Sequence, residues 1–66
     1  MTSKQKVLAV YPEADVLHRR MLGRTFYVVT IKNYGYHAIG EGFTESKAWV
    51  NAAKNIADGK QPGKFR

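Results

Sequence analysis

A helix with one face of small residues is the feature of this 66-residue chain that most constrains its fold. Thr44 can accept a backbone N–H bond as N-cap, Glu45 complements the positive end of the helix dipole, and Asp58-Gly59 supplies a stop. The residues that share one side of a 3.6-residue period are Ala48, Trp49, Ala52, Ala53, Ile56 and Ala57. We therefore predict a helix over residues 44–58 that lies close to a sheet, with Trp49 as its one large anchor.

The middle of the chain predicts three strands. The clearest covers residues 24–32, which are almost wholly β-branched or aromatic, and it is flanked by strands over residues 14–20 and 36–40. The turns between them are Met21-Leu22-Gly23 and Asn33-Tyr34-Gly35. Alternation along the central strand places Tyr27, Val29 and Ile31 on one face and Phe26, Val28 and Thr30 on the other. One of these faces must be covered by helices, and the other is left partly open.

The N-terminal segment, residues 2–11, permits either a helix or a strand. Ser3 is a possible N-cap and the apolar residues from Val7 to Tyr11 can form a helical stripe, although their β-branching also permits a strand. We favour a helix because the segment stops at Pro12 and the following residues are typical of extended structure. The predicted fold is α+β, in the order α-β-β-β-α, with a three-stranded antiparallel sheet packed on one face by two helices. It forms one domain over residues 1–59, followed by a flexible basic tail over residues 60–66.

This order of elements resembles that of double-stranded-RNA-binding domains. In that family the third strand leads through glycines into a helix that begins with serine and two lysines and later carries paired alanines. The matching residues here are Gly40, Gly42, Ala48 and Ala52-Ala53, with Thr44 in place of the serine. Glu45, Ser46 and Trp49 replace the three phosphate-binding lysines, and the first hairpin lacks the family's Gly-Pro-x-His signature. The resemblance therefore implies the fold more than RNA binding.

The chain also resembles small uncharacterised proteins of tailed bacteriophages and prophages. The shared motifs are Tyr11-Pro12-Glu13-Ala14, Gly40-Glu41-Gly42-Phe43-Thr44-Glu45 and Ala48-Trp49-Val50-Asn51-Ala52-Ala53. This likeness covers residues 7–56 and consists mostly of capping and packing residues. It implies a phage origin and an accessory role in the host cytoplasm, and it assigns no catalytic residue.

The composition and motifs argue against several classes of function. The chain has no cysteine, so it lacks a disulfide framework and a thiolate metal site. Neither His18 nor His37 has the spacing of a metal or catalytic site, and Gly40-x-Gly42 is not a phosphate loop. The apolar run over residues 7–11 is too short for a signal peptide or a membrane span. We expect a cytoplasmic protein that is not an enzyme and has no cofactor, metal, membrane or small-molecule substrate.

The charge distribution favours a nucleic-acid partner. Eleven Lys and Arg against five Asp and Glu give a net charge of +6, and no acidic residue lies between Val16 and Gly40. The predicted phosphate contacts, on the first hairpin and on the polar stripe of the helix, are Arg19, Arg20, Arg24, Lys32, Lys47, Asn51 and Lys54. Phe26, Tyr34 and Tyr36 could stack on exposed bases.

Protein docking is the alternative function. If the open sheet face is apolar, a domain this small can cover it by dimerising or by docking on an acidic host protein. The predicted interface then consists of Phe26, Val28, Tyr34 and Tyr36. The sequence alone leaves the choice between these two partner classes open.

Overall fold

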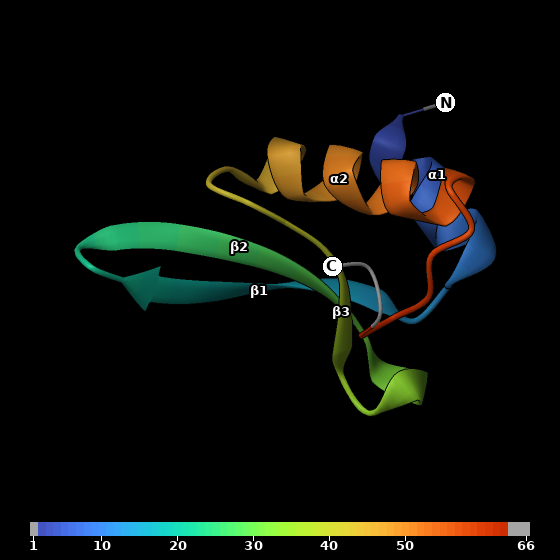
Figure 1. The fold of residues 1–66 in the computed structure, drawn as a ribbon, viewed down its shortest axis with the longest axis horizontal. Coiled ribbons are helices and arrows are strands. Elements are labelled where there is room, and N and C mark those ends of the chain that lie inside the picture. The colour runs from blue at the N-terminus through green and yellow to red at the C-terminus, as the bar shows by residue number, and fades with distance from the viewer. Residues whose placement is uncertain (1, 64–66) are drawn as a thin grey trace.

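The computed structural model describes residues 2–63, except for the side chain of Tyr34. Its elements are α1 (Ser3–Val10), β1 (Ala14–Met21), β2 (Arg24–Ile31), the 3-10 helix η1 (Lys32–Tyr34), β3 (His37–Gly42) and α2 (Glu45–Ala57). The strands form one antiparallel sheet in the order β1-β2-β3. Both helices lie over the same face of this sheet (Figure 1). The predicted α-β-β-β-α fold is therefore confirmed.

The segment that permitted two interpretations forms a helix, α1. Its N-cap is Thr2 and not Ser3, so that detail of the prediction is wrong. The Gln5 N–H donates to Thr2 Oγ1 at 3.2 Å, and the Thr2 N–H donates to Gln5 Oε1 at 3.0 Å. This reciprocal capping box satisfies two backbone donors of the first turn, which Ser3 would not do from inside the helix. The one buried residue of α1 is Val7.

The β1–β2 hairpin is regular and closes with a two-residue turn. Its register runs from Ala14 opposite Ile31 to Met21 opposite Arg24, leaving Leu22 and Gly23 as the turn. Both turn residues have positive φ, +51° for Leu22 and +77° for Gly23. Positive φ at both positions defines a type I′ turn, whose twist matches the right-handed twist of the two strands.

Strand β3 begins one residue later and ends two residues later than predicted. Val29 pairs with Gly40 whereas Thr30 pairs with Ala38, so Ile39 is an extra residue that forms a β-bulge. The glycines of this strand allow α2 to lie very close. A Cβ built on Gly40 would be 2.4 Å from the backbone nitrogen of Ala52.

Helix α2 has the predicted N-cap, since Thr44 Oγ1 accepts the Lys47 N–H at 3.1 Å. At its other end the Gly59 N–H donates to Ile56 O and the Lys60 N–H donates to Asn55 O, the two bonds of a Schellman motif. The buried residues of α2 are Ala48, Trp49, Ala52 and Asn55, while Ala57, predicted on the same face, is exposed. Ala57 lies off the buried stripe of the helix, because that stripe follows the spacing of Ala48, Ala52 and Asn55.

The core lies between the helices and the face of the sheet that carries Val29 and Ile31. Its buried residues are Val7, Val29, Ile31, Ile39, Ala48, Trp49 and Ala52. Tyr27 is partly buried against this cluster, so the predicted division of β2 into a covered and an open face is confirmed.

Two asparagines tie α2 to the bulged strand. Asn55 Nδ2 donates to Ile39 O at 2.8 Å, and the Glu41 N–H donates to Asn51 Oδ1 at 3.1 Å. Asn55 Nδ2 also lies 3.3 Å from Asn51 Oδ1. These bonds satisfy backbone groups of β3 that face away from β2, and they explain why a polar residue, Asn55, is 5% exposed.

Replacing Asn55 with leucine is expected to lower the free energy of unfolding by about 1–3 kcal/mol, because Ile39 O would remain buried without a donor. Urea denaturation followed by circular dichroism at 222 nm measures the change. Lys54→Leu is the matched control, since Lys54 is the exposed neighbour on the same helix. Equal midpoints for the two variants would contradict the assigned role of Asn55.

The chain after α2 returns to the sheet. The Gly63 N–H donates to Ala38 O at 2.7 Å, which places Gly63 beside strand β3. Residues 64–66 of the predicted tail lie outside the described residues, and the mobility of the tail stays a prediction. Within residues 2–63, the structure contains no helix whose length and hydropathy would let it cross a membrane.

Candidate functional site

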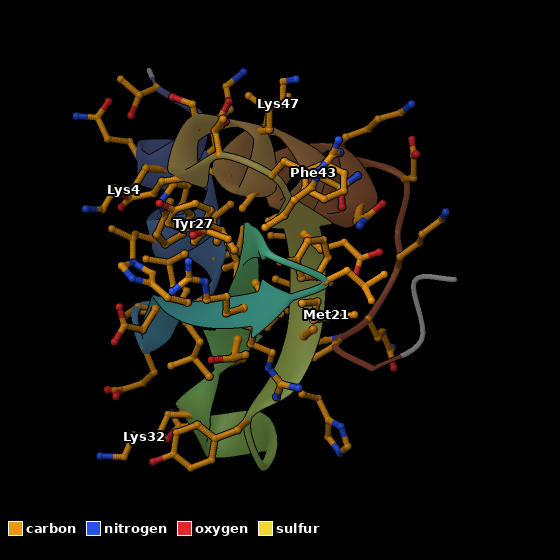
Figure 2. All side chains as sticks on the ribbon, turned by 90° about the vertical axis from the view of Figure 1, so that its left-hand side faces the viewer. Lys4, Met21, Tyr27, Lys32, Phe43 and Lys47 are labelled. Atoms are coloured by element: carbon orange, nitrogen blue, oxygen red, sulfur yellow. The ribbon has the colours of Figure 1, made fainter. Side chains whose placement is uncertain are left out.

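The end of the β1–β2 hairpin is the most distinctive surface of the molecule. It projects past the loop that leads into α2, at the left in Figure 1. We define the hairpin end as residues 19–26 together with Phe43 and Lys47. Figure 2 looks onto this end and shows Met21, Phe43 and Lys47 on it. A basic rim and an apolar centre meet here.

The three arginines of the hairpin end are exposed and point to both faces of the hairpin. Arg20 alternates with Val16 and His18, so it lies on the face that bears the helices. Arg19 and Arg24 alternate with Leu17 and with Phe26 and lie on the open face. The end therefore carries guanidinium groups on both sides of one narrow ribbon.

Lys47 is brought to the same end by the close contact of α2 with β3. A Cβ built on Gly42 would be 2.8 Å from Lys47 Cβ, and Gly42 pairs with Tyr27 of the hairpin. This contact explains how a residue distant in sequence joins the hairpin arginines. Of the predicted phosphate contacts, the structure thus gathers Arg19, Arg20, Arg24 and Lys47.

The other predicted phosphate contacts lie elsewhere. Lys32 follows β2 at the far end of the sheet, roughly 25 Å along the strand from Arg24, and Figure 2 shows it on the opposite side of the molecule from Lys47. Lys54 is two helical turns beyond Lys47, about 10 Å along α2. The amide of Asn51 is engaged with β3, so this side chain holds the fold together.

The apolar centre of the hairpin end includes residues that the sequence did not single out. Leu22 is fully exposed, at 101%, and Met21 and Phe43 are each 57% exposed. Together with Arg24 and Phe26 they line a crevice of about 310 Å³. The one sequence signal was Leu22 itself, a large apolar residue at a turn position that usually carries Asn, Asp or Gly.

Aromatic contacts hold this centre in place. The Phe26 and Phe43 rings meet edge to face with centroids 5.6 Å apart. The Arg24 guanidinium lies 5.7 Å from the Phe43 centroid, within the range of a cation–π contact. Phe43 therefore links the hairpin to the loop before α2 and orients Arg24.

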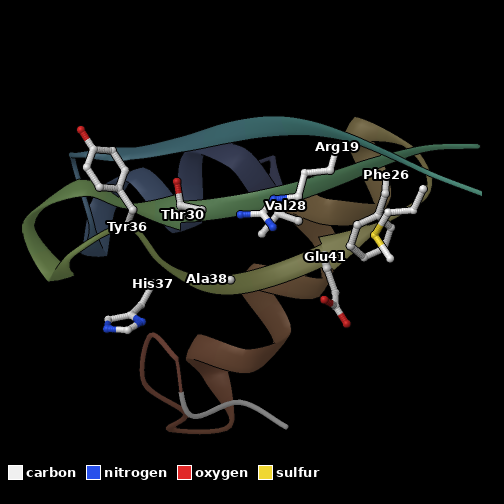
Figure 3. A pocket seen from close by; sticks show the side chains of 9 residues that line it. Arg19, Phe26, Val28, Thr30, Tyr36, His37, Ala38 and Glu41 are labelled. Carbon is white, nitrogen blue, oxygen red and sulfur yellow. The ribbon is translucent and has the colours of Figure 1, made fainter.

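The open face of the sheet is less apolar than the protein-docking hypothesis requires. Val28 and Thr30 point toward it but are only 8% and 4% exposed. Figure 3 shows Arg19 and Glu41 on either side of Val28, in a shallow hollow of about 630 Å³. Tyr36 is 60% exposed but lies at the β2–β3 turn, and the side chain of Tyr34 lies outside the described residues. Phe26, Val28 and Tyr36 all line this one hollow, but the polar side chains of Arg19, Thr30 and Glu41 line it with them and break up the apolar surface.

The histidines occupy ordinary surface positions. The His18 ring packs edge to face on Tyr27, with centroids 4.7 Å apart, and His37 lies at the start of β3. Over residues 2–63 no group of three His, Cys, Asp or Glu side chains is placed to hold a metal ion.

Comparisons of the chain with protein-family models, with curated proteins and with solved structures found no match.

Proposed function

We propose that this protein binds nucleic acid through phosphate contacts made by the hairpin end. The observation that carries the proposal is the projection of Arg20 and Arg24 from opposite faces of one hairpin, with Arg19 next to Arg20 and Lys47 packed against Gly42 beside the hairpin. No acidic residue occurs anywhere in the stretch between Val16 and Gly40. A ligand that carries negative charge on two sides fits this arrangement, as a nucleic-acid backbone does.

The chemistry of the basic groups supports phosphate as the ligand. An arginine presents a planar fork of donors that can bind a phosphate through two parallel hydrogen bonds. Arg24 is already oriented by the Phe43 ring, so it loses less side-chain freedom on binding than a free arginine would. Contacts of this kind are independent of base sequence and weaken steeply as salt rises.

The likeness to phage accessory proteins supports a small, non-enzymatic role for such binding in the host cytoplasm. Docking of the open sheet face on an acidic host protein, or on a second copy of the chain, has less support. Val28 is only 8% exposed, Phe26 packs on Phe43, and Glu41 adds a carboxylate to that face. The open sheet face thus lacks the well-exposed apolar or aromatic cluster on which a protein interface usually centres.

Changing Arg20 and Arg24 together to alanine is expected to weaken binding to a fluorescent 20-base-pair DNA duplex by about tenfold or more. The slope of log K against log salt should fall by about 1.8, or 0.9 for each lost phosphate contact. Fluorescence anisotropy at several salt concentrations measures both quantities.

The matched control is the Lys32→Ala, Lys54→Ala double variant, which removes the same charge from positions away from the hairpin end. It should change the affinity and the salt slope much less. Equal losses in the two double variants would show a general charge effect and would contradict a site at the hairpin end. Absence of binding by the unmodified protein at low salt would rule out nucleic acid as the partner.

A further inference from the structure

Leu22 is placed where neither folding nor solubility favours a leucine. It is the first residue of the type I′ turn, with φ of +51°, a conformation preferred by Asn, Asp and Gly and unfavourable for other side chains. Its side chain is fully exposed at the tip of the hairpin. Met21, next to it, is 57% exposed. The tip thus presents two apolar side chains to solvent at a position where an asparagine would form the turn better.

We propose that the hairpin inserts Leu22 into the minor groove of duplex DNA, where the leucine wedges between base pairs and bends the helix. This inference rests on the proposed nucleic-acid binding and names its ligand. Exposed leucine and methionine side chains are among those that partly unstack base steps in this way. Met21 lies at the side of the wedge and covers the opened step.

The positions of the arginines match the walls of a groove. Because Arg20 and Arg24 lie on opposite faces of the hairpin, each faces one of the two phosphate backbones when the tip points at the groove floor. When the arginines face the two walls, the two strands, about 4.8 Å apart, lie one behind the other along the groove, and a two-residue turn closes them. A positive side chain therefore faces a negative backbone on each side of the inserted tip.

The base of the hairpin gives the tip a firm support. The Phe26–Phe43 contact joins β2 to the loop before α2, and Arg24 packs over the same Phe43 ring. Lys47 lies at the start of α2, next to this contact, where it can reach a phosphate further along the backbone. Figure 2 shows Phe43 and Lys47 on the side of the end nearest α2.

Duplex DNA fits this geometry better than duplex RNA. The minor groove of B-DNA is about 6 Å wide, and both backbones lie close to anything inserted in it. The minor groove of A-form RNA is wide and shallow, so its two backbones lie farther from the tip of an inserted hairpin.

The test uses Leu22→Asn, because asparagine suits the type I′ turn and removes the apolar wedge. A 20-base-pair DNA duplex with a donor and an acceptor dye at its ends reports bending by energy transfer and binding by anisotropy. We expect the unmodified protein to bend the duplex and Leu22→Asn to bind about tenfold more weakly, with an unchanged salt slope and no bend. Val50→Asn, which also replaces an exposed aliphatic side chain with asparagine, at a 56% exposed position of α2, should leave binding and bending unchanged.

The thermal midpoint of Leu22→Asn should equal or exceed that of the unmodified protein, which separates loss of bending from loss of folding. Binding without bending, or equal bending by the unmodified protein and Leu22→Asn, would overturn the wedge and leave the phosphate contacts standing. Equal dependence on Leu22 with a duplex RNA would overturn the assignment to DNA. If no duplex is bound at low salt, the proposed function fails as well.

Discussion

Replacing Gly40 with alanine is expected to unfold most of the protein at room temperature. The added Cβ would lie 2.4 Å from the backbone nitrogen of Ala52 and 2.6 Å from its Cα, and backbone atoms cannot rotate out of the way. Helix α2 would have to move off β3, which would loosen Trp49 in the core and the bonds of Asn55 and Asn51. Overpacking of this kind costs about 3 kcal/mol or more when backbone is involved. A single core in so short a chain supplies only about 3–5 kcal/mol in total.

Gly59→Ala is the control for this prediction. Gly59 has φ of +79° and no atom within 4 Å of a built Cβ, so the change adds conformational strain without a clash. It should cost about 1–2 kcal/mol, well below the effect at Gly40. Thermal unfolding followed by circular dichroism compares the two variants. Similar midpoints would show that the close approach of α2 and β3 is not needed.

The elements of the fold were predictable because local signals agreed with the final packing. The run of β-branched and aromatic residues defined β2, and Thr44 with Asp58-Gly59 defined the ends of α2. What the sequence could not reveal were features that depend on two elements at once. The bulge at Ile39 depends on how β3 pairs with β2, and the burial of Asn55 depends on its hydrogen bond to Ile39 O across the contact between α2 and β3. A polar residue on an apolar stripe carries no such signal in the sequence.

The candidate site, too, was predictable only in the part that a single segment of the chain supplies. The basic character of the first hairpin followed from Arg19, Arg20 and Arg24, since no acidic residue interrupts them. The position of Lys47 could not be predicted, because it depends on the packing of α2 against Gly42. The distance of Lys32 and Lys54 from the hairpin end depends on the lengths of β2 and α2. Phe43 belongs to the segment before α2, and its place in the site follows only from its contact with Phe26. Strand alternation and not composition decides which face each arginine serves.

The core and the hairpin end are separate enough to be varied independently. Leu22, Arg20 and Arg24 are exposed and none belongs to the core cluster. Because the effects of mutations at well-separated sites are independent, changes to these three residues should affect binding without altering the stability of the core. A variant in the core should in turn reduce DNA binding only in proportion to the fraction of protein that it unfolds.

Replacing Trp49 with alanine is expected to lower the free energy of unfolding by about 3–5 kcal/mol, which would leave little folded protein. Trp49 is 5% exposed and is the largest side chain of the core cluster. Its indole N–H lies 3.5 Å from Glu45 Oε1, and the Lys4 ammonium lies 5.6 Å from the ring centroid, so the side chain also joins α1 to α2. Circular dichroism at 222 nm in urea measures the loss, because the variant has no tryptophan left to report fluorescence.

Two further variants separate the contributions of Trp49. Trp49→Phe keeps an aromatic ring but loses the indole N–H and part of the buried area, so it should cost about 1–2 kcal/mol. Val50→Ala, at the exposed neighbouring position, should change stability by less than about 0.5 kcal/mol. If Trp49→Ala were no worse than Trp49→Phe, the ring would not be the anchor that holds α1 and α2 together over the sheet. The hairpin end should bind DNA normally in Trp49→Phe, because that variant stays folded and every arginine of the site lies outside the core.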